Sequence, residues 1–163
     1  MMTKTKMTRR IERTLWRKMV AEKKSTYGAF EVTVGYVGQK VRGYDRADFV
    51  TMDTNGIVRA YEIKTSVEDF YSDAELSWCG DYNYFALTEQ VYDEVKDSRP
   101  LSWTNVGVYV LVPSEKLGDN LVCVKSAKKN TRSLGQRAEV MESMLKASSR
   151  DAGKLFKQDS YWG

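Results

Sequence analysis

The sequence predicts an α/β (α+β) fold in which a central mixed sheet is flanked by helices. Helical and strand patterns follow one another in the order α-β-β-β-α-β-α-β-β-α, and this order is typical of helices layered on a mixed sheet. The length of 163 residues suits one domain with a substantial core, and the apolar content of 42% suits a globular chain.

The first part of the chain predicts one helix and three strands. Apolar residues at helical spacing between Ile11 and Val20 predict a helix over residues 8–24. A strand follows over 29–37, and a Gly/Lys/Arg loop, GQKVRGYD, comes after it. Two further strands, RADFVTMD (46–53) and IVRAYEIK (57–64), are separated by the turn sequence TNG.

The second part predicts a helix over 66–79, with Ser66 as its N-cap and Asp69 at the capping-box position. The strand YNYFAL (82–87), a helix from Thr88, the strands GVYVLV (107–112) and NLVCVK (120–125), and a long polar helix over 133–157 follow. We divide the chain into a core, 1–124, and a basic C-terminal helical extension, 125–163, packed on the same domain. The apolar stripe of Val140, Met144 and Leu145 either packs on the sheet or pairs two copies in a homodimer.

The composition excludes several classes of site. Histidine is absent, which excludes Ser-His-Asp and Cys-His catalysis and histidine-ligated zinc. Cys79 and Cys123 fit neither a disulfide framework nor a zinc knuckle, so we expect reduced thiols in a cytoplasmic protein. No apolar run approaches the roughly 18 residues of a membrane span. Catalysis would therefore use carboxylates, lysine, tyrosine or a metal bound through oxygen.

The charge is distributed unevenly along the chain. Residues 1–28 carry a net +7, residues 29–124 a net −8 and residues 125–163 a net +5, which gives the overall +4. Two basic ends around an acidic body suit a polyanionic ligand with a cation site between them. Solvated helix faces produce the same pattern.

The turn between the two central strands decides which acids are neighbours. A three-residue loop, with Gly56 in the left-handed conformation, pairs Asp48 with Glu62. Directly opposed residues have Cβ atoms roughly 4.5–5.5 Å apart, so two carboxylates there need a proton or a cation between them. That cation is Lys64, Arg46 or a hard divalent ion, Mg²⁺ or Mn²⁺. A two-residue loop would separate the carboxylates onto opposite faces.

Glu12 is a third candidate acid. It lies near the middle of the apolar arc of the first helix. An acid in that position is uncommon unless it is paired or bound to a metal. A salt bridge to Arg9 or Lys64 is the structural alternative.

Asp48 is followed in the next strand by Glu62-Ile63-Lys64, and Glu12 lies in the preceding helix. With these residues the chain resembles the PD-(D/E)XK nuclease superfamily. The helix with Glu12, the three strands, the next helix and YNYFAL match its αβββαβ core, which is a restriction-endonuclease-like fold. More specifically, RADFV, AYEIKTSVEDFYSD and YNYFAL resemble the MmcB-like DNA repair proteins over residues 8–112.

Two departures from that family accompany the resemblance. Ala47 stands at the motif proline, as is usual in this branch. Glu75 and Leu76 stand where relatives usually carry a basic residue, which weakens the expectation that this helix contacts phosphate but leaves the metal site untouched.

The resemblance implies a metal-dependent nuclease that hydrolyses DNA phosphodiester bonds in repair or recombination. Asp48 and Glu62 would bind Mg²⁺ (or Mn²⁺), with the Ile63 carbonyl as a third ligand. Lys64 would orient or deprotonate the attacking water and balance charge on the phosphate, and Glu12 would hold a second metal or a metal-bound water. The alternatives are a non-catalytic nucleic-acid-binding protein that retains the fold, and a structural protein in which the charges form a satisfied salt-bridge cluster.

Two basic groups are candidates for phosphate contacts with DNA, although RNA fits the same pattern. The first comes from the Gly-rich loop and comprises Lys40, Arg42 and Arg46. The second is the run KSAKKNTR, with Lys125, Lys128, Lys129 and Arg132, for which a solvated linker is an equal alternative. Such contacts contribute affinity and salt dependence and do not read the base sequence.

Overall fold

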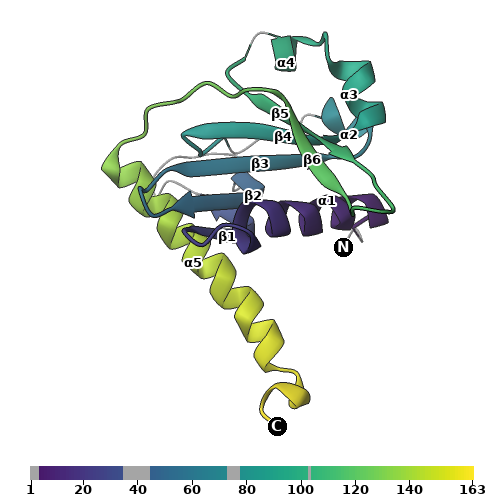
Figure 1. Cartoon of the computed structure of the whole chain (residues 1–163). Helices are drawn as coiled ribbons and strands as arrows, with labels where there is room; N and C mark the ends of the chain where they lie inside the picture. The colour runs from purple at the N-terminus through teal and green to yellow at the C-terminus, as the bar shows by residue number, and fades with distance from the viewer. Residues whose placement is uncertain (1–3, 35–44, 73–77, 103) are drawn as a thin grey trace.

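The protein is a six-stranded mixed sheet covered by helices, seen in the computed structural model in Figure 1. The structure describes residues 4–34, 45–72, 78–102 and 104–163. The strands are β1 (Thr26–Val34), β2 (Asp45–Asp53), β3 (Val58–Lys64), β4 (Tyr82–Thr88), β5 (Gly107–Val112) and β6 (Asn120–Lys125). They lie side by side in chain order, with β3, β4 and β5 parallel and the other neighbours antiparallel. The predicted α+β class with a mixed sheet is confirmed.

The helices form a layer on each face of this sheet. They are α1 (Lys6–Trp16), continued by the π-helical turn η1 (Arg17–Ala21), then α2 (Val67–Phe70), α3 (Glu89–Val95), α4 (Arg99–Ser102), α5 (Leu134–Phe156) and the 3₁₀ turn η2 (Asp159–Tyr161). Within the described part of the chain, no helix has the length and apolar character needed to cross a membrane.

Three buried clusters show which helix covers which face. Ile11 and Leu15 of α1 pack on Phe49, Tyr61 and other residues of one face. On the opposite face, α5 packs on the β1–β3 half of the sheet, where Ala60 is one of its neighbours. The helices α2, α3 and α4 cover the β4–β5 half of that same face.

The turn between β2 and β3 has the predicted three-residue form. Gly56 has a φ of 77°, in the left-handed region that favours glycine. The Asp53 carboxylate accepts the backbone N–H groups of Asn55 and Ile57 at 2.9 and 3.0 Å, which fixes the loop. The strands then pair Met52 with Val58, Val50 with Ala60 and Phe49 with Tyr61, so the predicted register is confirmed as far as Phe49 and Tyr61.

Several predicted boundaries are wrong. The helix predicted over 66–79 is capped by Ser66 as expected, but α2 ends at Phe70, and residues 78–81 are not helical. Residues 73–77 and the predicted strand end at 35–37 lie outside the described residues. The short helix α4 was not predicted, because its four residues are too few to show a helical period.

The segment after β6 returns along the sheet before α5 begins. Its backbone is held by two hydrogen bonds, from Lys128 N–H to the Asn105 carbonyl at 2.9 Å and from Asn130 N–H to the Asp81 carbonyl at 2.7 Å. Ser133 then caps α5 in a capping box with Gln136. The helix begins beside the β2–β3 turn and runs along β1 (Figure 1).

A buried aspartate anchors this returning segment to the core. The Asp81 side chain is fully buried and accepts the Val58 N–H at 2.8 Å. It also pairs with Arg137 of α5 at 3.1 Å. Asp81 therefore ties the start of β3 to the start of α5.

Replacing this anchor should destabilise the whole domain. Asp81→Ala leaves the Val58 N–H unpaired and removes the partner of Arg137, so we expect the free energy of unfolding to fall by about 3 kcal/mol. Urea unfolding followed by circular dichroism measures the change. The exposed Asp93→Ala on α3 is the matched control, with a change below about 0.5 kcal/mol. Equal stability of the two variants would show that Asp81 is no anchor.

Candidate functional site

The candidate site lies where β2 and β3 separate. Backbone pairing is recorded as far as Phe49 and Tyr61, and the next residues on each strand are Asp48 and Glu62. The Asp48 carboxylate accepts the backbone N–H of Ile63 at 2.7 Å, so a side chain replaces a backbone carbonyl in the ladder. The strands therefore diverge around an inserted carboxylate.

The two acids meet as the turn register predicts. Glu62 is only 4% exposed, and it shares a hydrogen bond with the Asp48 carboxyl group. Burial first, and then the Asp48 charge and that hydrogen bond, raise the pKa of Glu62 to about 9, against the Lys64 charge and a hydrogen bond from the Asp48 backbone. The Oε1 atom of Glu62 is buried without a hydrogen-bond partner. Such an orphaned oxygen is unusual in a folded protein.

Glu62 lies on the sheet face that α5 covers in one half and α2, α3 and α4 cover in the other, at the boundary between the two halves. It follows Ala60, which packs under α5, at the two-residue spacing that keeps side chains on one face. Its neighbour on β4 is Phe85, which packs under α2 and α3. Glu62 is thus buried between two apolar clusters, and Asp48 beside it is half-buried.

Lys64 follows Glu62 on the same face and is 6% exposed. Its ammonium group lies 3.4 Å from the Asp69 carboxylate of α2. The alternative in which Lys64 forms a direct salt bridge with Glu62 or Asp48 is therefore wrong, because Lys64 pairs with Asp69 instead. A buried lysine with one partner retains donors for a further acceptor.

The Ile63 backbone also faces the acids. In an antiparallel ladder the N–H and C=O of one residue point to the same neighbouring strand. Since the Ile63 N–H reaches Asp48, the Ile63 carbonyl is directed to the side of β2 as well. The Ile63 carbonyl is therefore on the same side of β3 as the Asp48 carboxylate.

Glu12 is held in a separate ion-pair cluster. It pairs with Lys4, and Lys4 also contacts Glu31 of β1 at 3.2 Å. The salt bridge from Glu12 to Arg9 or Lys64, which was the structural alternative, is therefore wrong, because the partner is Lys4. No group of three or more acidic or cysteine side chains in the described ranges is placed to hold a metal ion. Glu12 therefore does not complete a three-acid site with Asp48 and Glu62.

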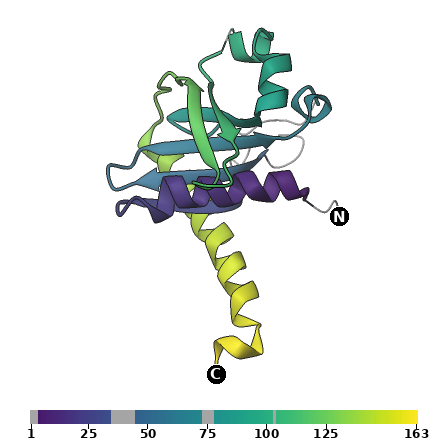
Figure 2. The ribbon, with the colours of Figure 1, turned by 45° about the vertical axis from the view of Figure 1, so that its right-hand side comes forward.

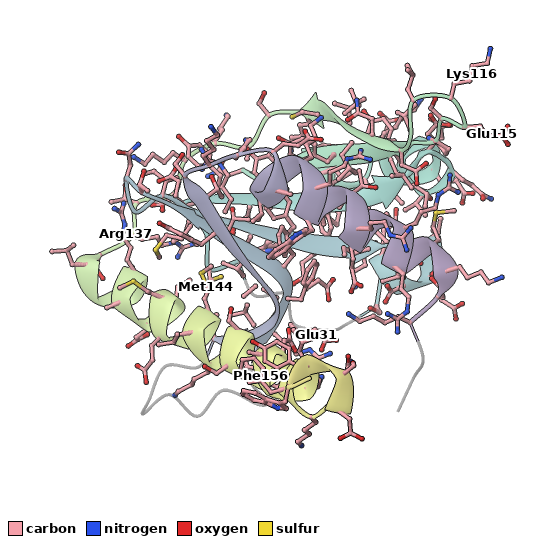
Figure 3. All side chains as sticks on the ribbon, turned by 60° about the horizontal axis from the view of Figure 1, so that its bottom comes forward. Glu31, Glu115, Lys116, Arg137, Met144 and Phe156 are labelled. Carbon is pink, nitrogen blue, oxygen red and sulfur yellow. The ribbon has the colours of Figure 1, made fainter. Side chains whose placement is uncertain are left out.

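Glu31 is a feature that sequence reasoning missed. It stands opposite Asp48 in the β1–β2 register, but its φ of 51° takes it out of the pairing. Its carboxylate binds Arg46 at 2.8 Å, and its carbonyl accepts from Arg150 of α5 at 3.0 Å. Figure 3 shows Glu31 beside α5. Nothing in the run AFEVTV signals this left-handed residue. Burial raises the pKa of Glu31, but Lys4, Arg46 and Arg150 outweigh it and the pKa is lowered.

The predicted basic groups divide between the two ends of the sheet. Lys40 and Arg42 lie outside the described residues. Arg46 lies near the acids and is paired with Glu31. The run KSAKKNTR begins where β6 ends, beside the first residues of β5, whereas Lys64 is at the last residues of the parallel strands. The run is therefore about 20 Å from Lys64, the length of β3.

Two members of that run already have structural partners. Lys125 donates to the carbonyls of Leu101 and Thr104 at the end of α4. Arg132 donates to the carbonyls of Gly80 and Trp78. Lys128 and Lys129 are exposed and remain candidates for phosphate contacts, but not beside Asp48 and Glu62.

Comparison with known proteins identifies a similar fold. No protein-family model and no curated protein matches the chain. Among solved structures, the SPO1766 protein of unknown function from Silicibacter pomeroyi is similar, with a TM-score of 0.68 and 17% sequence identity. The similarity covers 95% of this chain and 94% of that protein. At this identity it shows that the two chains share a fold over nearly their whole length.

The buried Glu62 carboxyl group makes stability depend on pH. A carboxyl group whose pKa is raised on folding contributes stability that is complete below its ordinary pKa and is lost as the pH rises through the folded value. Without added metal, the free energy of unfolding should therefore decrease between pH 4.5 and about 9. Glu62→Gln should flatten this dependence, and the exposed Glu68→Gln should leave it unchanged. Urea unfolding at a series of pH values in EDTA measures it, and identical slopes for wild type and Glu62→Gln would contradict the assignment.

Proposed function

We propose that this protein is a divalent-metal-dependent nuclease that hydrolyses DNA phosphodiester bonds, with a restriction-endonuclease-like core. The observation that supports this most strongly is the buried Glu62 beside the half-buried Asp48. One Glu62 oxygen has no hydrogen-bond partner, and a buried lysine lies two residues further along the strand. Leaving an acid oxygen unpaired inside a protein is costly unless a cation or proton occupies the place.

The donor set fits Mg²⁺ or Mn²⁺. Both ions prefer oxygen ligands, and a site of one or two carboxylates completed by water and phosphate suits Mg²⁺. Asp48 and Glu62 would hold the ion, and the Ile63 carbonyl faces the same side. When bound, the ion would lower the pKa of a coordinated water and neutralise charge on the phosphate.

The protein holds the Asp48 carboxylate in place and positions the Lys64 ammonium group. The Ile63 N–H holds the Asp48 carboxylate at 2.7 Å, so the ligand is oriented before anything binds. Asp69 holds the Lys64 ammonium at 3.4 Å. From there Lys64 would orient the attacking water and donate a hydrogen bond to a phosphate oxygen as negative charge increases on it.

The order of elements supports the proposed core. The helix α1, the strands β1, β2 and β3, the helix α2 and the strand β4 follow one another as αβββαβ. The acid of β2 and the Glu-x-Lys of β3 lie on neighbouring strands, directly after the last paired residues, Phe49 and Tyr61. The shortness of α2, together with Glu75 and Leu76 beyond it, leaves phosphate contacts to other segments.

A non-catalytic nucleic-acid-binding protein is the second candidate function. The observation that favours it is the pairing of Glu12 with Lys4, which leaves two acids rather than three at the described site. In that protein the fold would be kept, DNA would bind with strong salt dependence, and the Asp48–Glu62 pair would be satisfied by a shared proton.

Removal of the site residues should abolish cleavage. With labelled DNA and RNA substrates and Mn²⁺, we expect the wild type to release DNA products and EDTA to prevent it. Asp48→Ala and Lys64→Ala should each slow cleavage at least about 100-fold, because each removes charge stabilisation at the phosphate. The exposed Asp93→Ala and Lys96→Ala are matched controls.

The outcomes separate the candidate functions. Cleavage by both site variants at the wild-type rate would exclude this site. Tight, chelator-indifferent DNA binding without product would favour the non-catalytic protein. Melting curves of each variant exclude unfolding as the cause of a lost activity.

The basic residues at the two ends of the sheet should differ in effect. Arg46→Ala is expected to weaken DNA binding and to reduce the slope of log affinity against log salt by about 1, since one phosphate contact is lost. Lys129→Ala, at the distant end, should leave the cleavage rate within about twofold of wild type. Fluorescence anisotropy at several salt concentrations measures binding. A larger loss of DNA affinity for Lys129→Ala than for Arg46→Ala would reverse the proposed DNA path.

A further inference from the structure

The helix α5 is longer than the body that it packs against. Its 23 residues extend over about 34 Å. Its buried residues are Val140, Met144 and Ala147, all in the first two thirds of the helix. The remainder projects away from the sheet, as Figures 1 and 2 show from two directions.

A second apolar stripe runs along α5 beside the buried one. Its members follow one another at intervals of three, four, three, four and three residues, the spacing of a coiled-coil seam. They are Ala138, Met141, Leu145, Ser148, Ala152 and Leu155. The three large members are 49–67% exposed, so no part of the described chain covers them.

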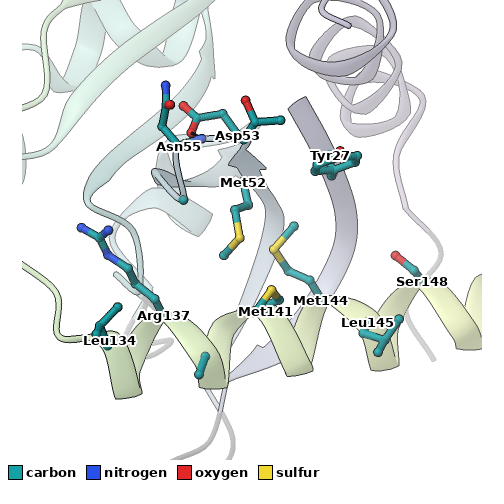
Figure 4. A pocket seen from close by; sticks show the side chains of 14 residues that line it. Tyr27, Met52, Asp53, Asn55, Leu134, Arg137, Met141, Met144, Leu145 and Ser148 are labelled. Carbon is teal, nitrogen blue, oxygen red and sulfur yellow. Dashed lines mark hydrogen bonds between the residues drawn. The ribbon is translucent and has the colours of Figure 1, made fainter. Parts of the chain in front are cut away.

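This seam forms one wall of a groove (Figure 4). The groove has a volume of about 930 Å³, and its opposite wall consists of Tyr27, Gly28, Met52 and the β2–β3 turn. A second hollow of about 350 Å³ continues it beyond Gly28 and Ser148, toward Trp16 and Phe30. Together they make an apolar trough along α5 from Leu134 to Asp151.

We propose that α5 of a second copy of this chain occupies the trough, antiparallel to the first, and forms a two-fold symmetric dimer. A seam of this kind pairs with itself when large residues meet small ones. In one antiparallel register Leu145 faces Ser148 of the second copy, Met141 faces Ala152, and Leu155 faces Ala138. Every layer then combines one large and one small side chain, as interdigitating packing requires.

The same register gives the exposed apolar residues at the two ends of α5 a partner in the second copy. It brings Leu134, which is 86% exposed, next to the η2 turn of the second copy. In that turn Tyr161 packs on Phe156, with ring centres 4.7 Å apart. A symmetric interface repeats each contact twice, so the two ends of α5 satisfy one another.

The exposed area is sufficient for a stable pair. Six large side chains contribute, at about 150–200 Å² for each when fully exposed. They are Tyr27, Leu134, Met141, Leu145, Leu155 and Phe156. Their exposed fractions amount to roughly 600 Å² in each copy and roughly 1,200 Å² in the pair, which reaches the range of specific interfaces.

Sedimentation of the full chain tests the dimer. We expect the wild type to sediment with twice the mass of one chain across the micromolar range. The double variant Met141→Glu, Leu145→Glu should be monomeric, with a dissociation constant raised at least about 100-fold, because the symmetric seam would bury four unpaired charges. Gly153→Glu is the matched control, since a side chain there meets nothing within 4 Å.

Cysteine cross-linking tests the partner and its register. In a Cys123→Ser background, the pair Met141→Cys with Ala152→Cys should form an interchain disulfide under mild oxidation. Met141→Cys alone should not, because its two copies would be about 16 Å apart along the helices.

A monomeric wild type would overturn the proposal, and so would a dimer that Met141→Glu, Leu145→Glu leaves intact. Cross-linking by Met141→Cys alone would overturn the register. Circular dichroism of each variant shows whether α5 remains folded.

Discussion

The site depends on a constraint of the backbone: a three-residue turn places Asp48 and Glu62 on facing strands. Asp53 holds that turn by accepting two backbone N–H groups, and Gly56 supplies the left-handed residue. A change of one residue in the loop would rotate one strand face and separate the acids. Because Glu62 is also buried between two apolar clusters and lies beside Asp48, a second negative charge there requires a proton or a cation. The chemistry proposed for the protein follows from this electrostatic conflict.

The parts of the structure that could be predicted from the sequence are those fixed by local chemistry. Examples are the β2–β3 register, the Ser66 cap and the start of α5 after Ser133, each decided by residues within four positions. The early end of α2 could not be predicted, because the sequence keeps a helical pattern as far as Cys79. In the structure α2 ends at Phe70, and Trp78 and Cys79 are not helical.

The site residues show the same division between local and distant effects. Asp48, Glu62 and Lys64 come together as the strand period predicts. The partners Lys4, Glu31 and Arg150 come from distant segments, and the left-handed Glu31 has no sequence signal. The run KSAKKNTR was a second candidate for phosphate contacts, and the antiparallel return of β6 carries it to the end of the sheet opposite the acids. The fold shared with the Silicibacter pomeroyi protein concerns architecture alone. The proposed function therefore depends on the acid pair and on Lys64.

The most direct measurement is anomalous diffraction from crystals of the full chain grown with Mn²⁺. We expect one peak between the Asp48 and Glu62 carboxylates, within bonding distance of the Ile63 carbonyl and beside Lys64. Carboxylates that point apart, or a Lys64 ammonium group lying between them with no manganese peak, would contradict it.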